Sequence, residues 1–209
     1  MKIVFLGNPN ISVSILSSLL KTENDIVGVV SNSPKISGRG LKKRYTPLGL
    51  YAINKKLKLL CLSSFKDEKL YRALKKLNPD LFIVVAFKII PQRFLNIPKF
   101  GAINLHASLL PNYRGASPIQ YALLNGDKKT GVTTFFMDDK IDNGKIIMQK
   151  EFKINDNDNY ESLMKKVESH GSDIVIKTID NIANNAKYQQ QDESNISYAP
   201  KIQKEMLLI

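Results

Sequence analysis

G-A-I-N-L-H-A-S-L-L-P-N-Y-R-G, residues Gly101–Gly115, is the stretch on which the fold and the chemistry of this chain both depend. It begins as an apolar strand in which Asn104 and His106 stand two residues apart, and residues at i and i+2 of a strand point to the same face. An amide and an imidazole are therefore presented side by side where the strand ends. The loop that follows contains Ser, Pro, Arg and Gly, which are typical of loops that wrap a ligand.

On the amino-terminal side of this stretch, apolar runs alternate with helical patterns. The predicted strands are Ile3–Leu6, Ile26–Val30, Leu57–Leu62 and Leu81–Ala86. The predicted helices between them have as caps Asn10, Thr46 (with Pro47 in the first helical position) and Asp67. Leu81–Ala86 is the most apolar run, so we expect a central strand buried on both faces. The alternation predicts an α/β fold: a doubly wound, mostly parallel, Rossmann-like sheet with helices on both faces.

In such a sheet ligands bind outside the carboxyl ends of the strands. Three segments are expected at that edge: Asn8–Ile11, Phe87–Pro91 and His106–Gly115.

On the carboxyl-terminal side, Ser117-Pro118 predicts the start of a short helix, and Gly131–Met137 and Lys145–Phe152 are predicted strands. Asp158 and Glu161 have the spacing of a capping box and predict the start of a helix of about two dozen residues. The polar run that follows it, residues 189–194, is expected to be a connector.

Length and composition suit one domain with a tail, because the chain has 209 residues of which 43% are hydrophobic. No window resembles a membrane span, and the first apolar run is too short for a signal peptide, so we expect a cytoplasmic protein. Cys61 is the single cysteine, which excludes a disulfide framework and predicts a buried structural thiol. With only His106 and His170 present, a histidine-rich metal site is excluded, and we expect no metal.

The net charge of +12 is concentrated in part within Ile26–Lys66, which has nine basic residues and no Asp or Glu. This segment indicates either a polyanionic partner or a solvated, lysine-rich face. Glycines and the lack of a helical period around Arg39–Arg44 favour the first interpretation there.

Three residues of the chain are candidates for acyl-transfer chemistry, and each has an ordinary structural alternative. His106 suits a general acid or base, or a core histidine; Asn104 suits an oxyanion donor, or a polar strand-end cap. Asp142, just before Asn143-Gly144, suits a partner that orients His106, or the first residue of a turn. His170, beside Gly171, is expected to be structural. The chain has no dinucleotide-binding glycine motif, P-loop, zincin or nucleophile-elbow motif.

A longer pattern joins these residues. It comprises Asn104-x-His106-Ala-Ser-Leu-Leu-Pro-x-Tyr-Arg-Gly115-Ala-x-Pro118-Ile, Gly131-Val-Thr and Asp142-x-Gly144. In this pattern the chain resembles the formyltransferase family that uses 10-formyltetrahydrofolate, and it is similar over nearly its whole length to the branch that acts on methionyl-tRNA. The resemblance implies a formyltransferase sheet, 10-formyltetrahydrofolate as co-substrate, and Asn104, His106 and Asp142 as the catalytic trio.

The resemblance also implies binding residues. The co-substrate-binding residues that it implies are Phe87, Lys88, Ile89, Ile90, Pro91, Ser108, Leu109, Leu110, Pro111, Asp138 and Asp139. The basic loop with Arg39, Lys42, Lys43 and Arg44 would contact the acceptor end of initiator methionyl-tRNA. Residues 1–187 would form the catalytic domain. Residues 188–209 would be a linker or tail, without the β-barrel tRNA-binding domain that follows in the family, and the protein would be a monomer.

The activity implied is direct transfer of a formyl group to the free amine of methionyl-initiator-tRNA for translation initiation, without an acyl-enzyme. Two alternatives stay open. A sugar-nucleotide N-formyltransferase would use the same trio on an amino sugar, and a non-catalytic remnant would bind RNA or folate only. The loop Tyr113-Arg114-Gly115-Ala116 fits glycinamide ribonucleotide formyltransferase poorly.

Overall fold

The structure of the protein is a computed structural model that describes residues 1–37, 42–184 and 186–203. Its Cα framework divides into two compact units. The first unit ends at Leu105, and the second begins at His106, the last residue of strand β7.

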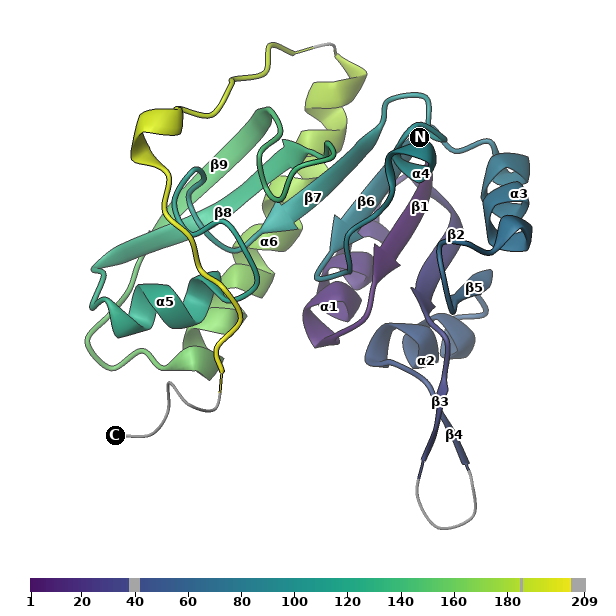
Figure 1. The fold of residues 1–209 in the computed structure, drawn as a ribbon, viewed down its shortest axis with the longest axis horizontal. Coiled ribbons are helices and arrows are strands. Elements are labelled where there is room, and N and C mark those ends of the chain that lie inside the picture. Colours follow the sequence, from purple (N-terminus) through teal and green to yellow (C-terminus); the bar gives the residue numbers. More distant parts are fainter. Residues whose placement is uncertain (38–41, 185, 204–209) are drawn as a thin grey trace. The chain divides into compact units, whose positions relative to one another are not determined.

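Five parallel strands form the sheet of the first unit, in the order β5-β2-β1-β6-β7 (Figure 1). They are β1 (Lys2–Gly7), β2 (Asp25–Asn32), β5 (Leu59–Leu62), β6 (Leu81–Val85) and β7 (Ala102–His106). Every residue of β6 is buried, and β6 lies between β1 and β7, as its apolar sequence predicts. The parallel pairing confirms the predicted α/β class.

The helices of this unit are α1 (Asn10–Leu19), α2 (Pro47–Asn54), α3 (Glu68–Leu77) and the short α4 (Gln92–Leu95). The chain runs from β1 outward to β2 and β5, then crosses back to β6 and β7 on the other side of β1. Because crossovers between parallel strands are right-handed, this reversal places α3 on the face opposite α1 and α2. Leu77 of α3 packs over Gly28 of β2, where a Cβ would lie 2.9 Å from Leu77 Cδ1. The sheet is therefore doubly wound, as predicted.

Two of the predicted helix caps are confirmed. The side chain of Thr46 accepts a hydrogen bond from Gly49 N at 2.9 Å, and that of Asp67 accepts one from Lys69 N at 2.8 Å. The prediction for Asn10 is wrong, because Pro9 occupies the cap position of α1 without a side-chain hydrogen bond and Asn10 is already helical.

Two other predictions for this unit need correction. The basic segment with Arg39–Arg44, expected to be a loop, belongs in part to an antiparallel pair of strands, β3 (Lys35–Ser37) and β4 (Lys42–Arg44), while Gly38-Arg39-Gly40 lies outside the described residues. Cys61 is exposed rather than buried, because β5 pairs only with β2 and forms an edge of the sheet.

The second unit contains α5 (Pro118–Leu124), the antiparallel strands β8 (Lys129–Phe136) and β9 (Ile146–Lys153), and α6 (Tyr160–Ala183). Helix α6 packs against both strands, and the hydroxyls of Thr134 and Thr178 are 2.7 Å apart in the interface. His170 of α6 stacks on Phe152 of β9, with ring centroids 4.8 Å apart, which agrees with a structural role.

The start of α6 is one residue later than the predicted capping box. Asn159 is the cap: its side chain accepts from Ser162 N, and the Ser162 hydroxyl accepts from Asn159 N, each at 3.0 Å. Asp158 lies just outside the helix, where its carboxylate contacts Lys166 and accepts from the Ser162 hydroxyl at 2.7 Å. Serine can replace the expected acidic residue because its hydroxyl also accepts a backbone N–H.

After α6 the chain doubles back over the second unit instead of leaving it (Figure 1). We call residues 189–199 the C-terminal strap; a short 3₁₀ turn, Glu193–Asn195, lies within it. The strap forms backbone hydrogen bonds with Ile146 at its start and with Arg114 and Ser117 at its end. Residues 189–199 belong to the segment expected to be a linker or tail. Among the described residues, no helix is long and apolar enough to cross a membrane.

Candidate active site

The candidate active site begins at the carboxyl end of β7. Asn104 and His106 are two residues apart in that strand and so face the same side of it. Asn104 is half-buried, whereas His106 is only 6% exposed. An imidazole this deeply buried needs partners for its ring nitrogens.

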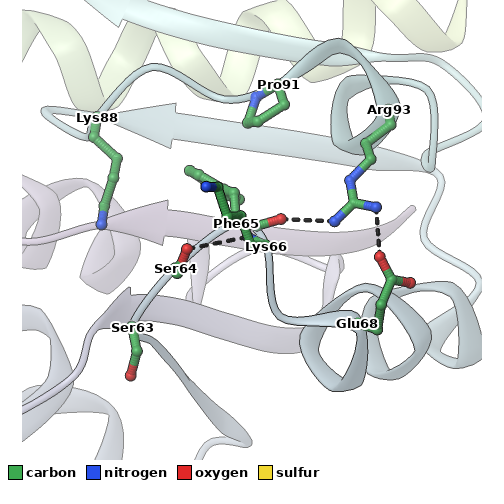
Figure 2. A pocket seen from close by; sticks show the side chains of 8 residues that line it. All are labelled: Ser63, Ser64, Phe65, Lys66, Glu68, Lys88, Pro91 and Arg93. Carbon is green, nitrogen blue, oxygen red and sulfur yellow. Dashed lines mark hydrogen bonds and ion pairs between the residues drawn. The ribbon is translucent and has the colours of Figure 1, made fainter.

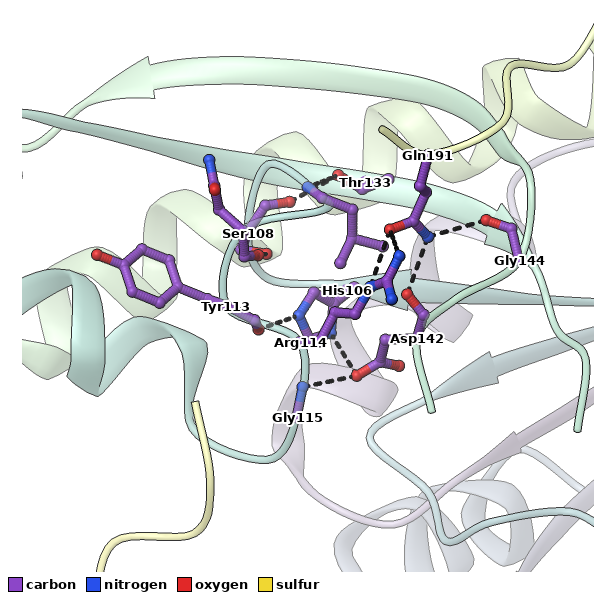
Figure 3. Close-up of polar contacts among 11 residues, drawn as sticks. His106, Ser108, Tyr113, Arg114, Gly115, Thr133, Asp142, Gly144 and Gln191 are labelled. Atoms are coloured by element: carbon purple, nitrogen blue, oxygen red, sulfur yellow. Dashed lines mark hydrogen bonds and ion pairs between the residues drawn. The ribbon is translucent and has the colours of Figure 1, made fainter. Parts of the chain in front are cut away.

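Both ring nitrogens of His106 face acceptors (Figure 3). Nε2 lies 2.8 Å from the carbonyl oxygen of Tyr113, and Nδ1 lies 3.7 Å from Oδ2 of Asp142. A carbonyl oxygen can only accept, so Nε2 carries a proton in this arrangement. The site therefore accommodates an imidazolium, whose second proton on Nδ1 would face the carboxylate.

Tyr113 is held so that its carbonyl points at His106. Its backbone has φ of 59°, in the left-handed region, and its N–H donates to Ser197 Oγ at 2.9 Å. Its hydroxyl donates to Asp127 at 2.7 Å and accepts from Asn125 at 2.8 Å. Burial is the main cause that raises the pKa of Tyr113; the bond to Asp127 also raises it, whereas the bond from Asn125 lowers it. The uncommon backbone conformation of Tyr113 is thus held by hydrogen bonds of its backbone N–H and of its side-chain hydroxyl.

Asp142 is the last residue of the turn at Ile141–Asp142, and it is oriented toward His106. Its φ is 50°, and its Oδ2 accepts the N–H of Gly115 at 2.8 Å. Gly115 has φ of 124°, and a Cβ there would lie 2.7 Å from the carbonyl oxygen of Ala199. Gly144 closes the turn so tightly that a Cβ would lie 1.6 Å from Phe136 O. Both glycines are required by close backbone approach.

The loop after His106 is built on β8. The hydroxyl of Thr133 donates to Ser108 O at 2.6 Å and accepts from Leu110 N at 3.1 Å. The Ser108 hydroxyl donates to Asn112 O at 2.6 Å, and the Leu110 side chain is buried with Phe135 and Ile146. Ser108 and Leu110 therefore shape the loop, whereas Leu109 and Pro111 are only partly buried.

The loop after β6 carries the other predicted co-substrate residues. Ala86 has φ of 49°, and in the segment Phe87–Pro91 the side chain of Ile90 is buried while Ile89 is 72% exposed. Lys88 and Pro91 line an open groove of about 670 Å³ in the first unit, together with Phe65 and Arg93 (Figure 2).

The lining of this groove has three cations, Lys66, Lys88 and Arg93, and one carboxylate, Glu68. Arg93 donates to Glu68 at 2.5 Å and to the carbonyl of Phe65 at 2.7 Å, so Glu68 compensates its charge. Lys88 lies 5.9 Å from the centroid of the Phe65 ring, and Lys66 lines the groove beside it. The groove is thus an open surface with an excess of positive charge.

The remaining predicted residues lie in two places. Asp138 accepts the N–H of Lys140 at 2.9 Å inside the turn that leads to Asp142, and Asp139 is exposed. Lys43 and Arg44 are exposed on β4, and Lys42 belongs to the same strand, whereas Arg39 is outside the described residues. Among the described residues, no three His, Cys, Asp or Glu side chains gather in a way suited to a metal ion.

Sequence analysis missed two residues that adjoin Asp142. Arg114, 5% exposed, donates from Nε and Nη2 to Oε1 of Gln191, at 3.1 and 2.7 Å. Gln191, 8% exposed, donates to the carbonyl oxygens of Asp142 and Gly144, at 2.8 and 2.9 Å. Arg114 stands within the recognised motif, but a glutamine in a run of polar residues gave no signal.

Comparison with known proteins identifies the family of the chain. The family model described as formyl transferase matches residues 1–179. The chain is 46% identical over 208 residues to the methionyl-tRNA formyltransferase of Flavobacterium psychrophilum; the match covers 98% of this chain and 66% of that protein. The chain therefore spans just under two thirds of the length of this curated relative.

Solved structures of formyltransferases have a similar fold. The N-formyltransferase from Helicobacter canadensis, in complex with folinic acid and dTDP-3-aminofucose, has a TM-score of 0.72 and 26% identity, covering 99% of this chain and 72% of that one. A glycinamide ribonucleotide transformylase from Symbiobacterium toebii shares the fold, with a TM-score of 0.74 at 20% identity, covering 92% and 94%. The family model, the sheet and the motif around His106 together show that this chain belongs to the formyl transferase family.

Proposed function

We propose that this chain is the catalytic part of a methionyl-tRNA formyltransferase. It would transfer a formyl group from 10-formyltetrahydrofolate to the amino group of methionyl-initiator-tRNA in the cytoplasm, for translation initiation, and act as a monomer. The observation that carries the proposal is the 46% identity over 98% of the chain to a protein of that name. The pairing of His106 with Asp142 supplies a site suited to the reaction.

The reaction needs no covalent enzyme intermediate. The α-amine of the methionyl group attacks the formyl carbon on N10 of the folate, and a C–N bond forms as the carbonyl becomes an oxyanion. The bond from that carbon to N10 then breaks, and a proton from the attacking amine ends on N10. The enzyme must stabilise the oxyanion and move that proton.

Asn104, His106 and Asp142 fit these two tasks. The amide of Asn104 and an imidazolium at His106 would donate to the oxyanion, and Asp142 would stabilise the positive charge of the ring. The 3.7 Å from Nδ1 of His106 to Oδ2 of Asp142 exceeds hydrogen-bond length, so a proton on Nδ1 stays available to the reacting atoms. Loss of one oxyanion donor typically costs about 100- to 1,000-fold in rate.

The co-substrate would be held by Phe87–Pro91, Ser108–Pro111, Asp138 and Asp139. In this assignment Ser108 and Leu110 contribute backbone groups, since the Ser108 hydroxyl bonds to Asn112 O and the Leu110 side chain is buried. Folates end in a glutamate with two carboxylates, and the excess positive charge of the groove beside Lys88 suits such groups.

The tRNA would be bound in part by the basic segment with Arg39, Lys42, Lys43 and Arg44. Support comes from the exposure of Lys43 and Arg44 on the antiparallel pair β3–β4. Strand pairing presents such side chains at fixed spacing, which suits contact with a phosphate backbone.

The experiment is single-turnover formyl transfer from 10-formyltetrahydrofolate to methionyl-initiator-tRNA, with the unchanged chain and with Asn104→Ala. Transfer that depends on Asn104 supports the proposal. Folate binding without transfer to the tRNA, but with transfer to an amino-sugar nucleotide, would replace it by the sugar-nucleotide activity that the Helicobacter canadensis structure suggests. Folate binding without transfer to either acceptor would favour a non-catalytic protein.

A further inference from the structure

Both the oxygen and the nitrogen of the Gln191 side-chain amide form hydrogen bonds in the site. Its oxygen accepts two N–H groups of Arg114, and its nitrogen donates to the carbonyls of Asp142 and Gly144. A guanidinium only donates and a carbonyl only accepts, so this network defines the orientation of the amide. Glutamate lacks the donors, and asparagine is one methylene shorter.

The two carbonyls that Gln191 binds, those of Asp142 and Gly144, stand on either side of position 143 in the chain, and Figure 3 shows both contacts. Asp142 has φ of 50°, a conformation that persists in a protein when its surroundings over-determine it. Holding the carbonyls of Asp142 and Gly144 restricts backbone rotation at Asp142 and so limits the direction of its Cα–Cβ bond. That direction decides whether Oδ2 reaches Gly115 N and faces His106.

Arg114 holds Gln191 in turn, and it is the residue next to Gly115, whose N–H donates to Asp142. The backbone of Arg114 is itself paired with the C-terminal strap, through Ser197 O at 2.9 Å and Ala199 N at 2.8 Å. The strap therefore contacts the backbone of Asp142 through Gln191. It also pairs with Arg114, the neighbour of the glycine whose N–H binds the Asp142 carboxylate.

From this network we infer that Gln191 and Arg114 are positioning residues for Asp142, and that the strap is part of the active site rather than a passive connector. Gln191 touches no reacting atom and acts by holding the turn at Asp142. The inference rests on the roles proposed for His106 and Asp142, but it can be tested without formyl transfer.

The test uses NMR of the two histidine rings, because the chain has only two. His170 stacks on Phe152 in α6 and β9 and serves as an internal reference; His170→Gln identifies its signals. Gln191→Met removes the amide at similar volume and without a charge. The matched control is Gln190→Met at the exposed neighbouring position.

At fixed neutral pH, Gln191→Met should shift the ring-proton resonances of His106 and leave those of His170 in place, and Gln190→Met should shift neither. In an Asp142→Asn background, Gln191→Met should cause no further shift of His106, because the residue through which it acts has lost its charge. With Asp142 intact, Gln191→Met should lower the rate of formyl transfer by about 10- to 100-fold with little change in KM, as expected when a reacting group is misplaced.

A second variant keeps the test decisive if Gln191→Met does not fold. Gln191→Glu keeps an acceptor for Arg114 but loses the amide donor. The direct effect of the new negative charge on the His106 resonances is measured in the Asp142→Asn background. An effect on His106 larger in the unmutated background supports the inference. His106 resonances that do not move, or that move equally in both backgrounds, overturn it. If the chain fails to formylate methionyl-tRNA, the NMR result still stands, so the two proposals fail separately.

Discussion

Nε2 of His106 lies 2.8 Å from the carbonyl oxygen of Tyr113, seven residues further along the chain. The short loop between them thus folds back so that its own backbone orients the ring. With Nε2 bound to a carbonyl, Nδ1 is the nitrogen that faces Asp142. The chemistry proposed for the site depends on this orientation.

Replacement of His106 by alanine should abolish formyl transfer while folate binding persists. The ring supplies the proton chemistry, for which a loss of about 100- to 10,000-fold is typical, whereas the proposed folate contacts come from other segments. Single-turnover transfer and equilibrium folate binding, measured on the same preparation, check this. Substantial residual turnover would remove His106 from its assigned role.

Asp142→Asn should lower the transfer rate by about 100-fold or more with little loss of stability. An asparagine keeps an acceptor for Gly115 N and tolerates the φ of 50°, but it removes the negative charge that faces His106. Transfer kinetics and urea unfolding should be compared with Asp156→Asn, at a highly exposed carboxylate of the same unit. Equal rates for wild type and Asp142→Asn would show that the charge is unnecessary.

Gly144→Ala should destabilise the second unit strongly, by more than about 3 kcal/mol, or prevent folding, because the added methyl would overlap a backbone carbonyl. Its Cβ would lie 1.6 Å from Phe136 O. Gly126→Ala is the control: Gly126 has φ of 66°, but nothing lies within 4 Å of its Cβ position. Urea denaturation of both variants makes the comparison, and similar midpoints would contradict the close approach.

Asp158 should stabilise the fold in a pH-dependent way. The hydrogen bond from Lys166, with smaller contributions from Asn155 N and Ser162, lowers the pKa of Asp158 from 3.8 to about 2. A carboxyl whose pKa is lowered by folding stabilises the fold fully at pH values above its pKa in the unfolded chain. That contribution is lost as the pH falls through its pKa in the folded protein.

The stability difference between wild type and Asp158→Asn should therefore be full at pH 7, smaller at pH 3 and mostly lost near pH 2. Asp156→Asn is the control, since Asp156 pairs with Lys128 and both are highly exposed. Urea unfolding at several pH values measures the difference. A gap that widens as the pH falls would reverse the assigned sign.

The basic segment should determine the salt dependence of tRNA binding. Each phosphate that a basic side chain neutralises makes the slope of log affinity against log salt concentration steeper by about 0.7 to 0.9. Replacing Arg39, Lys42 and Lys43 together by alanine should thus flatten the slope. The control replaces Lys145, Lys150 and Lys165, exposed lysines of the second unit, and an unchanged slope in the first variant would exclude the segment from tRNA binding.

Much of the fold follows from the sequence because its signals are local. The apolar run Leu81–Ala86 has no polar face, so only a strand buried on both sides suits it, and β6 is such a strand. Thr46-Pro47 and Asp67 start helices because the atoms that cap them lie within three residues. The prediction for the start of α6 fails because the neighbouring residues Asp158 and Asn159 compete for one cap with nearly equal propensities, whereas α1 starts after Pro9 without any side-chain cap.

The sequence by itself placed Asn104 and His106 on one face of one strand, and it marked Asp142 as a turn residue. Only the tertiary structure decided that Asp142 Oδ2 faces the ring, because that contact joins positions 36 residues apart through a turn at positive φ. It alone also decided that Gln191 contacts the turn, since no local pattern distinguishes a buried glutamine from the exposed ones beside it. Local periodicity determines elements, whereas a site built from loops depends on long-range hydrogen bonds that a linear pattern does not encode.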